Sequence, residues 1–340
     1  MRFSYFIAGL ALSSSLAGLA HARDQISIVG SSTVYPFATI VAEKFGQTSG
    51  FKTPVVESTG TGGGMKLFCG GIGVQYPDIT NASRAIKPKE ADNCAANGVE
   101  FIEIIAGNDG LAFSNSLEAE ALNLSVSHIA TALAAELPAG GMTDNKDAEY
   151  QPNALTTWAE VDQFVTAMGG SKANLPAKPI SIMVPPPTSG TRDALGALFV
   201  EPGLEVIGLQ ASEELREDGR VIEMGENDSL IIEKLVTDPS MFGVFGYSFL
   251  EQNRDKVQAS VVNGVELNFE NIASYDYPGA RPLFFYIKSA HIGVIPGMKD
   301  FIEEFVSEKA MGLDGYLFPA GLVPLTDEET ASQIAKISDN

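Results

Sequence analysis

Four turns rich in serine, threonine and glycine hold the residues of this sequence that are best suited to binding an anion. A turn that leads from a strand into a helix exposes unpaired N–H groups, and the helix N-terminus carries a partial positive charge. Serine and threonine add O–H donors, while glycine lets an oxyanion approach the backbone. The four turns are Gly30–Thr33, Ser58–Gly64, Asn81–Arg84 and Thr188–Arg192.

Any one of these turns could be ordinary helix capping, which uses the same residue types. Four such turns in one chain favour a shared ligand instead. Small polar residues from the turns are therefore candidate ligand-binding residues. They are Ser32, Thr33, Thr61, Ser83, Ser189, Gly190 and Thr191.

Two of the turns also carry an arginine, at Arg84 and Arg192. The planar guanidinium group matches the oxygen geometry of phosphate and sulfate. The alternative is a surface ion pair with one of the 43 acidic residues. Because only 22 residues are basic and two of them lie in these turns, we include both arginines as candidate anion ligands.

The turns are positioned by strands that alternate with helices. Predicted strands cover 25–29, 53–57 and 180–184, and predicted helices cover 36–45, 65–68 and a segment after Thr191. This alternation predicts an α/β fold in which parallel strands place ligands at their carboxyl ends.

Two further strand-like runs, 101–106 and 283–287, look like crossings between two lobes. A chain of 340 residues is long enough for two domains of ordinary size. We therefore predict lobe I from residues 24–106 plus 281–340, and lobe II from residues 107–280.

The overall charge argues against two kinds of partner. The formal net charge is −21 and the isoelectric point is near 4.4, so the surface repels nucleic acid and anionic membranes. Any anion site must therefore rely on local groups whose attraction exceeds the repulsion by this negative surface charge. Apolar residues make up 45% of the chain, which is enough for substantial cores.

The N-terminus predicts export. Residues 1–22 combine a positive start at Arg2, an apolar stretch and the cleavage pattern Ala20-His21-Ala22, which is typical of a secretory signal peptide. The alternative, a membrane anchor, is disfavoured because the apolar run is short and broken by serines. In an exported protein the two cysteines, Cys69 and Cys94, favour a disulfide over two buried thiols.

Catalytic patterns are missing from the sequence. It contains no zinc-protease, nucleophile-elbow or phosphate-loop motif and no cluster of cysteines and histidines. His128 and His291 are isolated, so we interpret them as structural. We expect a binding protein without catalytic residues, cofactor or metal.

Several of these turns also resemble segments of a known protein family. In order and spacing, seven segments resemble the signatures of periplasmic phosphate-binding proteins, the soluble receptors of the high-affinity phosphate ABC transporter. The segments are Gly30–Pro36, Gly60–Gly64, Asn81–Arg84, Ser189–Asp193, Gly225–Asp228, Gly243–Tyr247 and Arg281–Leu283.

This resemblance implies two α/β lobes of the periplasmic binding protein fold (type II), each a mostly parallel sheet flanked by helices, joined by two hinge strands. It implies that inorganic phosphate binds in the cleft. Ser32, Thr33 and Thr61 would donate from lobe I, and the segment from Ser189 to Thr191 from lobe II. It also implies a periplasmic location and an inner-membrane ABC permease as partner. We expect a monomer.

Two departures from the family affect selectivity. Many members have an aspartate at the position of Arg84 and an arginine at the position of Pro185. That aspartate accepts the proton of hydrogen phosphate and so helps to reject sulfate. Asp193 or Asp228 could replace it. Receptors for sulfate, arsenate, a phosphonate or a phosphate ester therefore remain alternatives, with a secreted phosphate-ester hydrolase as a further one.

Overall fold

The computed structural model describes residues 23–139 and 149–338, and most of their strands form one continuous mixed sheet. The predicted signal peptide, residues 1–22, lies outside the described residues. In sheet order the strands are β2 (Val55–Ser58), β1 (Ser27–Gly30), β3 (Ile79–Ala82), β13 (Ala280–Lys288), β4 (Phe101–Ser116), β10 (Phe242–Gly246), β8 (Ile182–Val184) and β9 (Val221–Glu223), with β11 (Val257–Ala259) also paired to β4.

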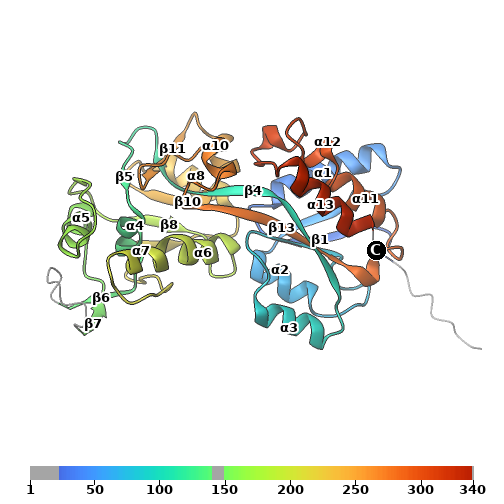
Figure 1. Ribbon diagram of the computed structural model, residues 1–340, viewed down its shortest axis with the longest axis horizontal. Helices are drawn as coiled ribbons and strands as arrows, with labels where there is room; N and C mark the ends of the chain where they lie inside the picture. Colours follow the sequence, from blue (N-terminus) through green and yellow to red (C-terminus); the bar gives the residue numbers. More distant parts are fainter. Residues whose placement is uncertain (1–22, 140–148, 339–340) are drawn as a thin grey trace, which may run out of the picture.

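Helices surround both ends of this sheet (Figure 1). Around β1 to β3 lie α1 (Tyr35–Thr48), α2 (Thr61–Phe68), α3 (Pro88–Ala96), α11 (Met298–Phe305), α12 (Glu308–Met311) and α13 (Asp327–Ser338). The other half contains α4 (Val126–Leu133), α5 (Trp158–Ala167), α6 (Gly190–Leu195), α7 (Glu201–Val206), α8 (Asp228–Thr237), α9 (Tyr247–Glu251) and α10 (Phe269–Ala273). Two short strand pairs, β5 (Asn123–Leu124) with β12 (Val261–Val262) and β6 (Glu136–Pro138) with β7 (Tyr150–Pro152), complete this half.

The two longest strands, β4 and β13, run side by side from one half of the molecule to the other (Figure 1). They pair antiparallel, with Phe101 opposite Lys288 and Gly110 opposite Ala280. The predicted crossing strands are thus present but longer than expected. The outer strands are parallel, as predicted, and the sheets of the two halves join into one because both halves share this central pair.

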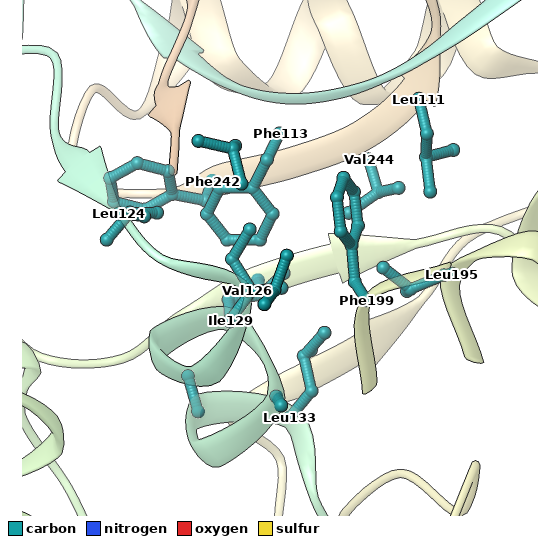
Figure 2. Close-up of a cluster of buried hydrophobic side chains, with 14 of the residues drawn as sticks. Leu111, Phe113, Leu124, Val126, Ile129, Leu133, Leu195, Phe199, Phe242 and Val244 are labelled. Carbon is teal, nitrogen blue, oxygen red and sulfur yellow. The ribbon is translucent and has the colours of Figure 1, made fainter. Parts of the chain in front are cut away.

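The hydrophobic residues form two large cores, one on each side of the site described below. One core takes residues between Ile26 and Ala106 and between Leu283 and Leu322. The other takes residues between Leu111 and Ala280, with Val323. Figure 2 shows part of the second core, where Phe113 of β4 and Phe242 of β10 stack against each other near α4. We keep the predicted bounds as the definition of lobe I, which holds the first core, and lobe II, which holds most of the second.

Helix α1 forms as the sequence predicts. Pro36 occupies its first turn, where a missing N–H costs nothing, and Phe37, Val41 and Phe45 face the core. Helix α2, in contrast, begins at Thr61, four residues before the predicted start. Of its three glycines, Gly64 is required by packing, because a Cβ there would lie 2.6 Å from the Cα of Gly30.

The predicted disulfide is confirmed. Cys69 and Cys94 are bonded, with their Cα atoms 4.3 Å apart, and they tie the end of α2 to α3. Both cysteines lie fully buried in a small core with Phe68 and Tyr286.

Replacing both cysteines with alanine should lower the free energy of unfolding. The bridge closes a loop with a sequence separation of 25, for which the chain-entropy model gives about 3 kcal/mol. Urea denaturation of the double variant, compared with the oxidised wild type, measures this loss. A change below about 1 kcal/mol would show that the bridge restricts the unfolded chain far less than this model assumes.

Candidate functional site

The centre of the site is a buried network that joins both lobes around Arg281 of β13. The guanidinium group donates to Asp109 of β4 (Nη2–Oδ2 2.8 Å), to the hydroxyl oxygen of Thr191 (3.0 Å) and to that of Thr33 (3.4 Å). Asp109 is held in turn by the backbone N–H of Tyr247. Because Asp109 balances the charge of Arg281, the network acts mainly through oriented dipoles and not through net positive charge.

Thr33 of lobe I and Thr191 of lobe II contact each other directly, with their hydroxyl oxygens 2.8 Å apart. Only one of these two hydroxyls can donate in that bond, and both oxygens already accept from Arg281. One threonine O–H therefore remains available to donate to a ligand.

A second contact between the lobes lies beside the first. Thr61, the first residue of α2, accepts from the backbone N–H of Ser83 (3.1 Å) and shares a hydrogen bond with its hydroxyl (3.3 Å). Across the cleft, a Cβ on Gly190 would lie 2.3 Å from the Thr61 hydroxyl and 2.4 Å from that of Ser83. The described structure is therefore closed, with lobe I packed directly on the start of α6.

Two serines order the turns before helices of the site. Ser31 accepts from the backbone N–H groups of Thr33 and Val34 in the turn before α1. Ser189 accepts from the N–H of Thr191 at the start of α6, which continues through a π-helical turn into α7. For Ser189 the capping role does not exclude a ligand role, because its own O–H has no acceptor among the described residues.

Ser32 and Asp228 have buried polar atoms without hydrogen-bond partners in the described part of the chain. The Ser32 hydroxyl and both carboxylate oxygens of Asp228 are in this state. Both residues line a cavity of about 610 Å³ between the lobes. Other lining residues come from lobe I, such as Tyr35 and Ser58, and from lobe II, such as Glu226. The candidate anion site thus borders a space that a ligand could fill.

Arg84 lies at the edge of the cleft, and its guanidinium group forms ion pairs with two carboxylates. It pairs with Glu90 of its own lobe (2.8 Å) and with Asp193 of lobe II (Nε–Oδ2 2.5 Å). Lys87 also reaches Asp193 (2.9 Å). The sequence places Arg84 among the candidate anion ligands but does not identify Asp193 as its partner, because an ion pair between residues 109 positions apart leaves no local signal.

Arg192 points away from the polar network. Its guanidinium group contacts the carbonyl of Pro185 (3.3 Å) and lies 3.5 Å from Glu223 on the surface of lobe II. Of the nine candidates, the structure gathers Ser32, Thr33, Thr61, Ser83, Ser189, Gly190 and Thr191 around the cleft. Arg84 lies at the edge of the cleft, Arg192 lies outside the polar network, and both are close to carboxylates.

Sequence reasoning missed the two charged residues at the centre of the site. Asp109 follows the predicted crossing strand 101–106, and Arg281 precedes the predicted crossing strand 283–287, at the start of one of the family-like segments. Asp228 was considered solely as a possible replacement for an aspartate of the family. Nothing in the local sequence shows that Arg281 and Asp109 lie opposite each other on β13 and β4.

The histidines have structural partners, in line with the sequence interpretation. His128 bridges Ser125 and Asp162, and His291 bridges Asp78 and the carbonyl of Ile72. Within residues 23–139 and 149–338, no group of three or more histidines, cysteines or acids is arranged to hold a metal ion.

The sequence pattern of the PBP superfamily domain matches residues 17–309. The chain belongs to the PBP superfamily. Among curated relatives, the protein SphX from Synechococcus elongatus is 31% identical and aligns with 82% of this chain and 73% of its own length. The phosphate-binding protein PstS from Staphylococcus saprophyticus is 24% identical, with coverages of 91% and 83%.

Solved structures show the same fold as this PBP superfamily member. A substrate-binding protein from Clostridium perfringens that carries bound phosphate matches with a TM-score of 0.61 and 23% identity, and it covers 89% of this chain and 100% of its own. An ABC-type phosphate transport receptor from Vibrio cholerae matches with a TM-score of 0.58 and 18% identity, with coverages of 88% and 99%. The α/β fold predicted from the sequence is therefore confirmed.

The ion pairs between Arg84, Lys87 and Asp193 should stabilise the closed cleft of this PBP superfamily member. Replacing Asp193 with alanine removes both bridges between the lobes, and we expect a bound anion to dissociate about five- to tenfold faster at low salt. Stopped-flow dissociation measures the rate. The difference should shrink in high salt, where exposed charges are screened.

Glu90→Gln is the matched control, because Glu90 pairs with Arg84 inside lobe I and the amide still accepts a hydrogen bond. Its dissociation rate should stay near that of the wild type. An Asp193→Ala rate equal to wild type at low salt would show that these bridges do not stabilise closure.

Proposed function

We propose that this protein captures inorganic phosphate between its two lobes and delivers it to an ABC permease. The observation that carries the proposal is the buried set of hydroxyl donors from both lobes around the Arg281–Asp109 pair. Free donors are the O–H groups of Ser32 and Ser189, one from the Thr33–Thr191 pair and one from the Thr61–Ser83 pair.

This donor set suits a dehydrated tetrahedral oxyanion. A buried anion loses its hydration shell, and only several well-placed hydrogen bonds can replace it. Rigid hydroxyls at helix starts supply these bonds without adding mobile charge. The surface charge of −21 repels anions at long range, so the affinity must come from these short-range contacts.

The relatives support phosphate as the ligand and transport as the role. PstS is named a phosphate-binding protein, the Clostridium perfringens structure holds phosphate, and the Vibrio cholerae protein is a phosphate transport receptor. We extend both roles to this chain as a binding protein, not an enzyme, that acts in the periplasm as a monomer. The export signal at residues 1–22 belongs to this proposal. Among the described residues, no helix is long and apolar enough to cross a membrane.

Closure of the cleft gives the permease a state to recognise. Thr33 meets Thr191, and the N–H of Gly62 donates to the carbonyl of Thr188 (3.0 Å) from the opposite lobe. These contacts require the two lobes to be together, so an opening motion about β4 and β13 would break them. A ligand held by both lobes shifts the equilibrium toward the closed form.

Calorimetric titration of the purified, phosphate-stripped protein tests the proposal. Phosphate should bind with a 1:1 ratio, and sulfate should bind far more weakly. Binding of sulfate but not phosphate would make the protein a sulfate receptor. Turnover of a chromogenic phosphate ester that is lost in Thr61→Ala would support a hydrolase instead.

A further inference from the structure

The cavity between the lobes is larger than inorganic phosphate needs. Its volume of about 610 Å³ falls in the range of about 300–1,000 Å³ that is typical of sites for small organic ligands. Ser32, whose hydroxyl has no partner among the described residues, belongs both to this cavity and to the candidate anion site. Tyr35, Val56 and Phe249 add apolar wall, which a bare anion does not use. A ligand held at the anion site therefore has room to extend into the cavity.

The charged residues that line this cavity are all acidic. They are Glu57, Glu226 and Asp228, and none of the described lining residues is basic. Asp228 is fully buried, and neither of its carboxylate oxygens meets a hydrogen-bond donor in good geometry among the described residues. Glu226 gives one oxygen to Thr188, and its other oxygen is buried in the same unpartnered state. Because buried carboxylates are ordinarily paired, this end of the cavity lacks a cation.

The charges around Asp228 do not supply that cation. Arg281 attracts it from β13, but Arg281 is already paired with Asp109 of β4, and Asp109 repels Asp228. Burial, helped by Asp109 and Glu226, raises the pKa of Asp228 to about 7. Burial also raises the pKa of Glu226. A positive group between the two acids would reverse both shifts.

Glu226 lies where the acidic end of the cavity meets the anion site. Its paired oxygen accepts from Thr188, the residue before Ser189. A Cβ on Gly60, the residue before Thr61, would lie 2.2 Å from that same oxygen. Glu226 therefore reaches from lobe II to lobe I beside both walls of the anion site. Donors for an anion and acceptors for a cation are neighbours in one cleft.

We propose that the cleft also binds phosphate monoesters that end in a protonated amine, with the phosphate group on the hydroxyl donors and the ammonium group between Glu226 and Asp228. This inference rests on the proposed function, because it uses the same anion site. An ammonium group has three N–H donors, which suit the free oxygens of the two acids, and its charge offsets theirs. The alkyl chain between the two ends would contact the apolar lining residues. Inorganic phosphate satisfies only the hydroxyl end.

The proposal makes the preference for an amine depend on pH. Asp228 faces Asp109, Arg281 and Glu226, and it changes charge near pH 7. At pH 8.0 it is ionised and attracts the ammonium group, whereas at pH 6.0 it keeps its proton and the attraction weakens. Alkyl amines stay protonated over this range, as lysine does. A change in preference therefore reports on the protein.

Calorimetry with O-phosphoethanolamine and propyl phosphate tests this inference, because propyl phosphate carries a methyl group in place of the ammonium group. At pH 8.0 the wild type should bind O-phosphoethanolamine at least about tenfold more tightly than propyl phosphate, as expected for a close, buried charge pair. This preference should shrink at pH 6.0. The phosphate groups of the two esters titrate alike, so their own ionisation cancels in the ratio.

Glu226→Gln should remove most of the preference for the amine. The amide oxygen still accepts from Thr188, so propyl phosphate should bind at least as tightly as it does to the wild type. Glu233→Gln is the matched control, because it removes the same charge from an exposed position of α8 outside the cavity. It should keep the wild-type preference.

Four results would overturn the inference and leave the proposed function intact. They are phosphate binding without a preference for O-phosphoethanolamine, a preference that is equal at both pH values, a full preference in folded Glu226→Gln, and phosphate affinity that free ethylammonium raises as much as the linked amine does. The first two need only the wild type, so they decide even if Glu226→Gln does not fold. A wild type that binds no phosphate would instead refute the proposed function.

Discussion

Replacing Gly190 with alanine should abolish tight phosphate binding and leave the protein folded. The added Cβ would lie within 2.4 Å of the hydroxyls of Thr61 and Ser83, so lobe I could no longer pack on α6. Both of these atoms belong to the opposite lobe, and Gly190 itself has helical backbone that alanine adopts readily. We expect at least a hundredfold loss of affinity by calorimetry, on the order of 3 kcal/mol.

Gly62→Ala is the matched control on the other wall. Gly62 also lies in the first turn of a helix at the cleft, but its Cβ would come no closer than 3.5 Å to the carbonyl of Thr188. Its affinity should remain within threefold of wild type. The melting temperature of ligand-free Gly190→Ala should equal or exceed that of wild type. If Gly190→Ala binds phosphate as tightly as Gly62→Ala, the closed cleft is not the binding state.

Replacing Arg281 with alanine should remove phosphate binding and destabilise the fold. Loss of the guanidinium group frees Thr33, Thr191 and the carbonyl of Gly190 from their common donor. It also leaves Asp109 buried without its ion pair, which costs about 3–5 kcal/mol. Urea denaturation and calorimetry on the same preparation measure the two effects.

A double variant separates the role of Arg281 in the site from its role in stability. In Asp109→Asn with Arg281→Met both charges of the buried ion pair are removed together, and the asparagine can still accept from the N–H of Tyr247. We expect most of the lost stability to return while phosphate binding stays absent. Phosphate affinity within tenfold of wild type in this double variant would show that the Arg281 network does not organise the site.

The sequence predicted the parts of this protein that depend on local patterns. The strand–turn–helix units, the first turn of α1 with Pro36 and the disulfide all follow from residue type and short spacing. Seven of the nine candidate residues also meet at the cleft, because turns at the ends of neighbouring strands are brought together by the sheet itself.

The charged part of the site could not be predicted in the same way. Arg281 lies 172 positions from Asp109, and Arg84 lies 109 positions from Asp193. The sheet places Arg281 of β13 opposite Asp109 of β4, whereas Arg84 meets Asp193 because the two lobes close on each other. The early start of α2 at Thr61 could not be predicted either, because its glycines are poor helix formers and the close packing of Gly64 on Gly30 is set by the sheet.

Diffraction from crystals grown with phosphate would test the central claim most directly. We predict tetrahedral density between the turn at Ser32–Thr33 and the turn at Ser189–Thr191. Its oxygens should lie within hydrogen-bond distance of groups from both lobes. Density bound by one lobe only, or a closed cleft with phosphate elsewhere on the surface, would contradict this account.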